Sequence, residues 1–270
     1  MSAQLHLPPN ATFDIIDHLS EDTETLLTCS LVSLAWMARS RAHAFYSVDV
    51  ISTTRLRSFF DLLRGGKHSF RFCVQKLFIG FGSCDIRMGL KRSDLVLLLG
   101  KLPTLLSIIL KDVSWVDDSG VTPRSLSYTP LHLKSLKLLN LTVGDNAISA
   151  RGLSSVIRLF SGVDLFCIYW DADVKFSTDA VVAPLASAKT IALPKLGELA
   201  LMNSPMSART LKWLGNIGIC NSLTALAVYV ADESTLIALG QLLRLSGQSL
   251  KVVTIYLFHN KGLCHLTRES

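Results

Sequence analysis

The sequence lacks the short motifs that mark common enzyme and metal sites. It contains no H-E-x-x-H, G-x-S-x-G or G-x-x-x-x-G-K-[ST] motif, so zinc peptidases, typical serine hydrolases and P-loop proteins are not indicated. No cysteines form a C-x-x-C pair, and the histidines are not paired with Cys or Asp at ligand-like spacing. We therefore expect no catalytic residue, no metal, no cofactor and a protein that is not an enzyme. Motifs do not reveal a Ser or Cys nucleophile with distant partners, because triads are assembled in space.

Long apolar runs and a secretory signal are also absent. The longest apolar stretch, 95–110, is interrupted by Gly100, Lys101 and Pro103 and is shorter than the roughly 18–20 residues of a membrane span. It fits a helix followed by a strand. The N-terminus has no basic start followed by an apolar run. With six cysteines interpreted as reduced thiols, these features predict a cytoplasmic or nuclear protein without a membrane partner.

Charge is scarce and unevenly distributed. Charged residues make up 18% of the 270 residues and hydrophobic residues 49%, a composition that suits a large buried core. Residues 1–50 hold two basic and six acidic residues, a net charge of −4, whereas the whole chain carries +6, so residues 51–270 carry +10. Two regions of opposite charge suggest two roles.

A basic run lies between residues 55 and 76, where six basic residues surround the single acid Asp61. It could attract nucleic acid or an acidic partner. Because it has no aromatic–basic motif, a solvated face is the preferred interpretation, and we expect no nucleic-acid partner. The basic residues are Arg55, Arg57, Arg64, Lys67, Arg71 and Lys76.

The first fifty residues predict three short helices. Apolar residues at 13, 15, 16 and 19 recur at helical spacing, and the break at Ser20-Glu21-Asp22 can cap a second helix. A third helical stretch contains Trp36 and ends near Arg39 and Arg41. Three short helices cannot bury all of this apolar surface among themselves. Part of it must contact the following domain, as a cap, or a partner protein.

These residues resemble the F-box, in the form common among fungal F-box proteins. The resemblance runs over residues 5–50, through Leu7-Pro8-Pro9, Ile15-Ile16-Asp17-His18-Leu19, the segment 26–33 and Trp36; Asn10 stands where the family usually has Glu. It implies a docking surface for the Skp-type adaptor of a cullin–RING ubiquitin ligase. By position, the residues that would form or support this surface are Leu7, Pro8, Ile15, Ile16, Leu19, Leu26, Val32 and Trp36.

An apolar phrase recurs along the rest of the chain. Each copy has an apolar residue, two others, an apolar residue, one other and an apolar residue, as in 223–228. The middle apolar residues are Leu77, Ile108, Leu136, Phe166, Leu199, Leu226 and Val253, at intervals of 31, 28, 30, 33, 27 and 27 residues. The phrase predicts a strand with one buried face, and helix-like stretches lie between copies at 94–99, 153–160, 211–217 and 236–245.

The period is near that of leucine-rich repeats, and the phrases resemble the irregular repeats that follow many F-boxes. We therefore expect an α/β chain, α+β overall, with a three-helix F-box at 5–50, a connecting segment at 51–72 and a leucine-rich-repeat-like solenoid of strand–helix units at 73–270. The alternative is a generic α/β domain with leucine-rich strands. The stretch 257–270 is short for a terminal cap, so a truncated C-terminus is expected.

Alternation along each strand predicts which side chains point away from the core. A row takes one outward residue from each strand. The row formed by the last such residue of each phrase is Gly80, Lys111, Leu139, Tyr169, Met202, Tyr229 and Tyr256. The row before it is Phe78, Ile109, Lys137, Cys167, Ala200, Ala227 and Thr254. Exposed aromatic residues anchor protein partners, so Tyr169, Met202, Tyr229 and Tyr256 are the candidate substrate-binding residues. The alternative is that these four are ordinary half-buried strand residues.

Together, the two regions predict the substrate-recognition subunit of a Skp–cullin–F-box-type ubiquitin ligase. It would bind the adaptor, and through it a cullin, by the F-box, and an unknown protein substrate by the repeats. The alternative is a leucine-rich-repeat interaction scaffold without a ligase role, whose N-terminal helices only complete the fold.

Overall fold

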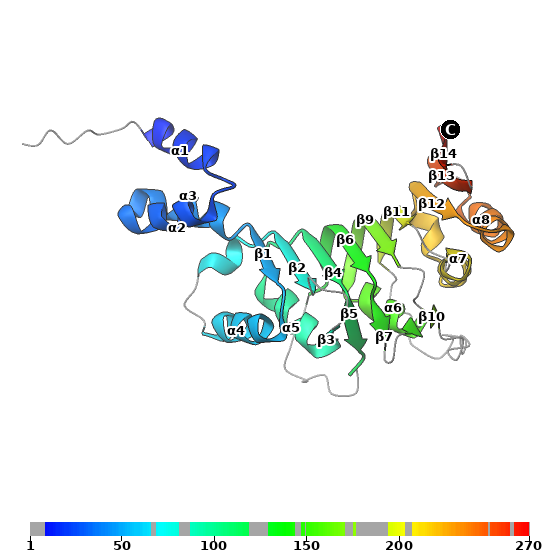
Figure 1. The fold of residues 1–270 in the computed structure, drawn as a ribbon, viewed down its shortest axis with the longest axis horizontal. Coiled ribbons are helices and arrows are strands. Elements are labelled where there is room, and N and C mark those ends of the chain that lie inside the picture. The colour runs from blue at the N-terminus through cyan, green and yellow to red at the C-terminus, as the bar shows by residue number, and fades with distance from the viewer. Residues whose placement is uncertain are drawn as a thin grey trace, which may run out of the picture.

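The centre of the fold is a nine-stranded sheet in which the strands lie side by side in chain order (Figure 1). We describe it from a computed structural model, which describes residues 9–65, 69–80, 87–118, 129–143, 147–148, 150–170, 175–176, 194–202, 207–247, 249–259 and 262–269. The strands from β1 to β13 pair in parallel, and β14 pairs antiparallel with β13. The fold is therefore mixed α/β, as the repeated phrase predicts, and its sheet is mostly parallel.

The strands of the main sheet are β1 (Ser47–Val50), β2 (Lys76–Gly80), β4 (Ser107–Lys111), β6 (Leu131–Leu139), β9 (Phe160–Tyr169), β11 (Lys195–Met202), β12 (Ala225–Val230), β13 (Val252–His259) and β14 (Gly262–Glu269). The shorter strands are β3 (Met88–Lys91), β5 (Val113–Val116) and β7 (Thr142–Val143), which form a second parallel sheet, and the pair β8 (Ala147–Ile148) and β10 (Lys175–Phe176).

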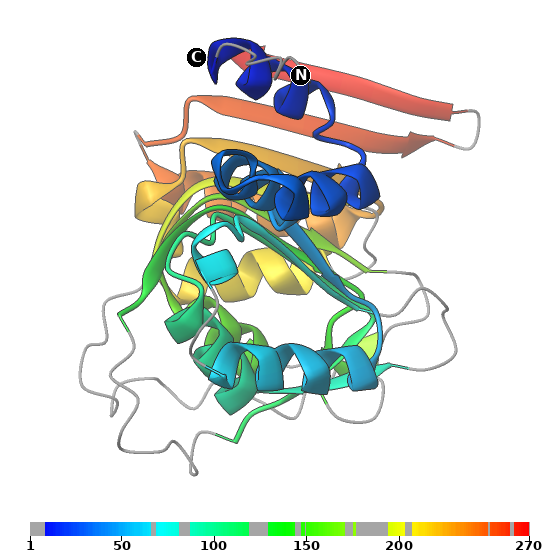
Figure 2. The same cartoon turned by 90° about the vertical axis from the view of Figure 1, so that its left-hand side faces the viewer.

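The helices are α1 (Pro9–His18), α2 (Thr23–Val32), α3 (Leu34–Ala44), α4 (Thr53–Arg64), α5 (Arg92–Lys101), α6 (Ala150–Ile157), α7 (Ser207–Asn216) and α8 (Glu233–Ser246), with short 3₁₀ helices η1 (Ser69–Phe72) and η4 (Ile219–Ser222). Helices α1–α3 gather at the β1 end of the sheet, and the later helices lie on one side of it (Figures 1 and 2). Of the predicted helix-like stretches, 94–99 and 236–245 lie inside α5 and α8. The stretches 153–160 and 211–217 overlap α6 and α7.

The strand register confirms the predicted rows. Each middle apolar residue is the direct neighbour of the next, from Leu77 beside Ile108 to Leu226 beside Val253. From β2 to β12 these residues are at most 2% exposed, because they pack against the helices in one apolar core. The outward rows follow the same register, although the β11–β12 pairing ends at Leu201 and Val228, one residue before Met202 and Tyr229. Their side chains therefore point to the opposite face of the sheet.

The sheet begins earlier than the sequence indicates. Val48 of β1 is the direct neighbour of Leu77, and residues 47–50 fall in the range assigned to the F-box. The spacing from Val48 to Leu77 matches the repeat, so extending the phrase one unit upstream would find β1. Helix α4 occupies most of the predicted connecting segment 51–72. Its apolar residues Leu56, Phe59, Phe60 and Leu63 lie in the core, while its basic residues Arg55, Arg57 and Arg64 are exposed.

Two residues with left-handed backbones form the corners between the main and second sheets. Asp112 (φ 52°) follows β4 and Asn140 (φ 54°) follows β6. Asx residues tolerate this conformation better than other non-glycine residues. The buried Asn140 amide donates to the Asp112 carboxylate at 2.9 Å, so successive corners are joined. Helix α5 is likewise capped from the adjacent unit, because Asp118 accepts the backbone N–H of Ser93 at 3.0 Å.

The described apolar residues form two clusters. The large one fills the space between the main sheet and its helices. The small one consists of Ile16, Leu26 and Ala44, with Leu19, Trp36 and Phe45 packed against it. Phe45 contacts both clusters, and its ring lies 5.2 Å from that of Phe70. The N-terminal helices are therefore packed around their own core and joined to the sheet through this residue.

Truncation of a central core residue tests the sheet-and-helix core. We expect Phe166→Ala to lower the free energy of unfolding by about 3–5 kcal/mol, since it removes a fully buried ring from the middle of the sheet. Urea unfolding followed by circular dichroism measures the change. The control is Leu236→Ala on the exposed side of α8, where we expect a change within about 0.5 kcal/mol. Equal effects of the two substitutions would contradict this arrangement of the core.

Candidate functional site

A solvent-exposed apolar surface lies where α2 ends and α3 begins. Leu31, Val32 and Leu34 are 82%, 68% and 83% exposed, and Leu27, one helical turn before Leu31, is also exposed. We call these four residues the α2–α3 surface. Burying one such side chain fully contributes about 1.5–3 kcal/mol, so their exposure is unfavourable for an isolated chain. Large apolar side chains grouped at the surface mark a site of protein or membrane contact.

The structure divides the predicted adaptor-binding residues into three groups. Ile16 and Leu26 are fully buried, and Leu19 and Trp36 pack against them, so these four support the helices from inside. Ile15 and Val32 are exposed. Leu7 and Pro8 lie outside the described residues. The exposed residues Phe13, Leu27, Leu31 and Leu34 are absent from the sequence-based set, although their exposure makes them the better contact residues.

An ion cluster fastens α1 to α3. The Asp17 carboxylate accepts hydrogen bonds from Arg39 Nε at 2.7 Å and from His43 Nε2 at 2.8 Å. The Arg39 guanidinium, followed by His43, holds the pKa of Asp17 well below its usual range. The same guanidinium lies 5.7 Å from the centre of the Phe13 ring. These contacts, together with the small apolar cluster, hold α1 against the second half of α3.

The open face of the main sheet is the second candidate surface. Tyr169 lies directly beside Met202, and Tyr229 directly beside Tyr256. Met202 is exposed and the three tyrosines are half-buried. The row begins at Gly80, where a Cβ would lie 2.3 Å from the Lys111 carbonyl oxygen, so only glycine fits there. The four predicted residues are therefore brought together as a band at one end of the strands β9, β11, β12 and β13.

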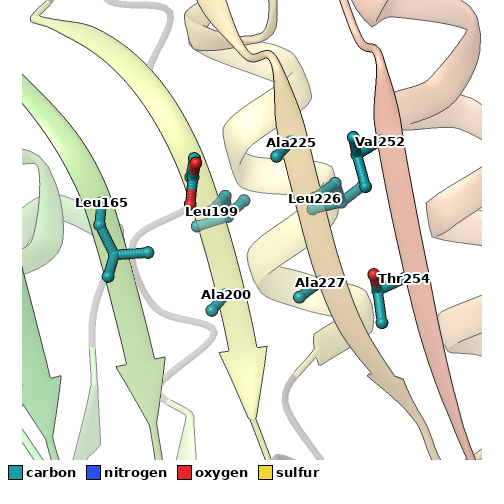
Figure 3. Close-up of a pocket in the computed structure, with 9 residues that line it drawn as sticks. Leu165, Leu199, Ala200, Ala225, Leu226, Ala227, Val252 and Thr254 are labelled. Carbon is teal, nitrogen blue, oxygen red and sulfur yellow. The ribbon is translucent and has the colours of Figure 1, made fainter. Parts of the chain in front are cut away.

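A shallow hollow of about 290 Å³ lies beside this band, in the neighbouring outward rows. Figure 3 shows the residues that line it. Its floor is made of small side chains, Ala200, Ala225 and Ala227, while Leu165 and Val252 stand at its sides. Glu198 also lines it. The volume is at the lower limit of small-molecule pockets, which span about 300–1,000 Å³. The hollow therefore suits one or two side chains of a protein partner.

Positive charge lies on the open face next to the hollow. Lys111 and Lys137 are half-buried on adjacent strands, β4 and β6. Lys137 is the direct neighbour of Cys167. Burial raises the pKa of the Cys167 thiol, and the Lys137 charge opposes this shift. A second hollow of about 210 Å³ near β1 is lined by both Asp49 and Lys76 and so carries mixed charge.

In the described part of the chain, no group of three or more His, Cys, Asp and Glu side chains is placed to hold a metal ion. No described helix is both long and apolar enough to cross a membrane. Compared with models of known protein families and with curated proteins, the chain matches none.

Removal of the Asp17 carboxylate tests the ion cluster. We expect Asp17→Asn to increase amide hydrogen exchange of α1 several-fold, because α1 loses its charged contacts to α3. The control is Glu21→Gln, an exposed acid in the same acidic region. The Asp17 pKa lies below its ordinary value of 3.8. The stabilisation is therefore complete at neutral pH and is lost as the pH falls below about 4 toward the folded-state pKa. Unchanged α1 exchange in the variant would contradict this role of Asp17.

Proposed function

We propose that the chain is the substrate-recognition subunit of a Skp–cullin–F-box-type ubiquitin ligase. The observation that carries the proposal is the α2–α3 surface, four exposed apolar residues at the junction of two short helices, three of which are 68–83% exposed. A docking surface of this kind is what the resemblance to the F-box implies for this segment. The α2–α3 surface and the band of Tyr169, Met202, Tyr229 and Tyr256 belong to different parts of the fold, so one chain can hold two partners at once.

The sheet and its helices form, in this proposal, an irregular leucine-rich-repeat solenoid. The in-register apolar rows, the parallel pairing in chain order and the helices on one face support this interpretation. The open face is then the substrate surface. The ligase chemistry belongs to other subunits, and this chain contributes proximity by holding the substrate near the loaded conjugating enzyme. The proposed location is the cytoplasm or nucleus.

The alternative is an interaction scaffold whose N-terminal helices cover the end of the sheet without binding an adaptor. One observation favours it. Phe45 packs into both apolar clusters, and the Tyr46 carbonyl oxygen accepts the backbone N–H groups of Gln75 and Lys76, each at 2.9 Å. The helical segment is thus already attached to the sheet. The exposed α2–α3 surface favours the ligase role, since these contacts leave it uncovered.

Co-purification with recombinant Skp-type adaptor separates the two functions. We expect a stable complex with the full chain at micromolar concentration. The double substitution Leu31→Asp and Leu34→Asp should weaken it at least about tenfold, because both residues are anchors in the proposed interface. The matched control is Leu236→Asp with Ile237→Asp, which places the same charges on α8 at residues that are each 53% exposed. A folded wild-type chain that forms no complex would leave only the scaffold function.

Removal of two tyrosines from the band tests the proposed substrate surface. We expect the double substitution Tyr229→Ala and Tyr256→Ala to abolish substrate capture, measured by proximity labelling in cells, without loss of the adaptor complex. The two residues are adjacent, so their loss removes one continuous part of the band. Phe72→Ala is the control, because Phe72 is an exposed aromatic residue on η1 and not part of a strand. Undiminished capture by the double variant would refute the assignment.

A further inference from the structure

The open face combines a positive pair of lysines with an apolar hollow, and the spacing between them is set by the strands. We propose that the substrate segment recognised here is an extended peptide in which acidic residues (Asp or Glu) precede or follow an apolar residue by about three or four positions. The inference rests on the proposed function, since it specifies the substrate class of the same sheet face.

The lysine pair can bind one carboxylate from two sides. Ile109 of β4 is the direct neighbour of Lys137, and Lys111 is two residues further along β4, so the lysines are diagonal neighbours on one face. In the described part of the chain, no carboxylate lies within salt-bridge distance of either lysine. Both side chains are half-buried. Their attraction for a carboxylate is therefore less screened by solvent than that of fully exposed lysines.

The hollow supplies the second anchor. Ala200 and Ala227 are direct neighbours in the same outward row as Lys137, with Cys167 between Lys137 and Ala200. The small side chains in this row leave an open space, and the larger residues Leu165 and Val252 border it on two sides. When an apolar side chain of the substrate enters the hollow, the apolar surface of that side chain and that of the hollow are both removed from water. Tyr169 and Met202 stand in the next row and border the peptide on that side.

Strand geometry gives the length of the motif. Lys137 lies on β6, and the hollow is centred on β11 and β12, two to three strands away in the sheet. Neighbouring strands are about 4.8 Å apart, so the separation is about 10–14 Å. An extended peptide advances about 3.3 Å per residue, which gives three or four residues between the two anchors.

Glu198 disfavours an acidic residue in the hollow. Its exposed carboxylate lines the hollow on the side away from the tyrosine band. An acidic residue of the substrate would be repelled there and attracted to Lys111 and Lys137. The apolar residue therefore occupies the hollow while the acidic residues lie over β4 and β6. A peptide with basic residues in place of the acidic ones would face the lysine pair and bind poorly.

Binding of defined peptides to the full chain tests the proposal. The probe is a fluorescent Gly/Ser peptide that carries two glutamates and, about three residues away, a leucine. We expect binding that weakens at least about tenfold when the glutamates become lysines or when the leucine becomes serine. Moving the leucine next to the glutamates should weaken binding in the same way. Equal binding of all four peptides would overturn the proposal.

Charge reversal on the protein provides a gain of binding that misfolding cannot mimic. The double substitution Lys111→Glu and Lys137→Glu should lose binding of the glutamate peptide and gain binding of the lysine peptide. Ala227→Leu should weaken binding of the glutamate peptide by filling the hollow. Lys195→Glu, an exposed charge at the start of β11, is the matched control and should behave as the wild-type chain. If the Lys111→Glu, Lys137→Glu double variant does not bind the lysine peptide more tightly than the glutamate peptide, the lysine assignment is overturned.

The outcomes separate this inference from the proposed function. Loss of substrate labelling in the tyrosine variant, together with no binding of the glutamate–leucine peptide, would refute the acidic–apolar motif and leave the ligase proposal standing. Specific peptide binding by a chain that forms no adaptor complex would support the motif and refute the ligase role.

Discussion

The parallel, in-register pairing of the strands is the constraint on which the rest of the molecule depends. Each strand presents one apolar row to the helices, and a shift of one residue would turn that row to solvent. Because the row from Leu77 to Leu226 is buried throughout, the register of every intervening strand is determined. The same pairing aligns the outward rows, so residues about 30 positions apart in the chain, such as Tyr229 and Tyr256, become direct neighbours.

The corners at Asp112 and Asn140 help to hold the strands in this register. A strand that leaves the main sheet must change direction within one residue, and Asp112 and Asn140 do so with left-handed backbones. Their side chains then bond to each other across adjacent units, which couples one corner to the next. Trp170, in the following unit, donates its indole N–H to the Leu141 carbonyl oxygen at 3.3 Å. The Asn140 amide and the Trp170 indole N–H, both buried near the corners, thereby have hydrogen-bond acceptors.

The N-terminal helices have a different physical basis. Their core is small, and several of their apolar residues face solvent, so packing within the segment explains only part of its composition. Asp17 adds a charged contact between α1 and α3, and Phe45 joins the segment to the sheet. A segment built in this way keeps its outer face available to a partner while its inner face holds it to the chain. The ligase proposal uses both properties.

The sequence by itself determined the strand rows, the helices between them and the tyrosine band, because burial of one strand face leaves a period-two pattern that repeats with each unit. It indicated three N-terminal helices but could not separate Ile16 and Leu26, which are buried, from Leu31 and Leu34, which are exposed. Helix α2 is apolar on several sides, so its period does not identify the inner face. Only the tertiary structure decided that division, the place of β1 in the sheet, and the hollow on the open face. These features depend on contacts between side chains from segments that are distant in the sequence, and local sequence patterns carry no information about such contacts.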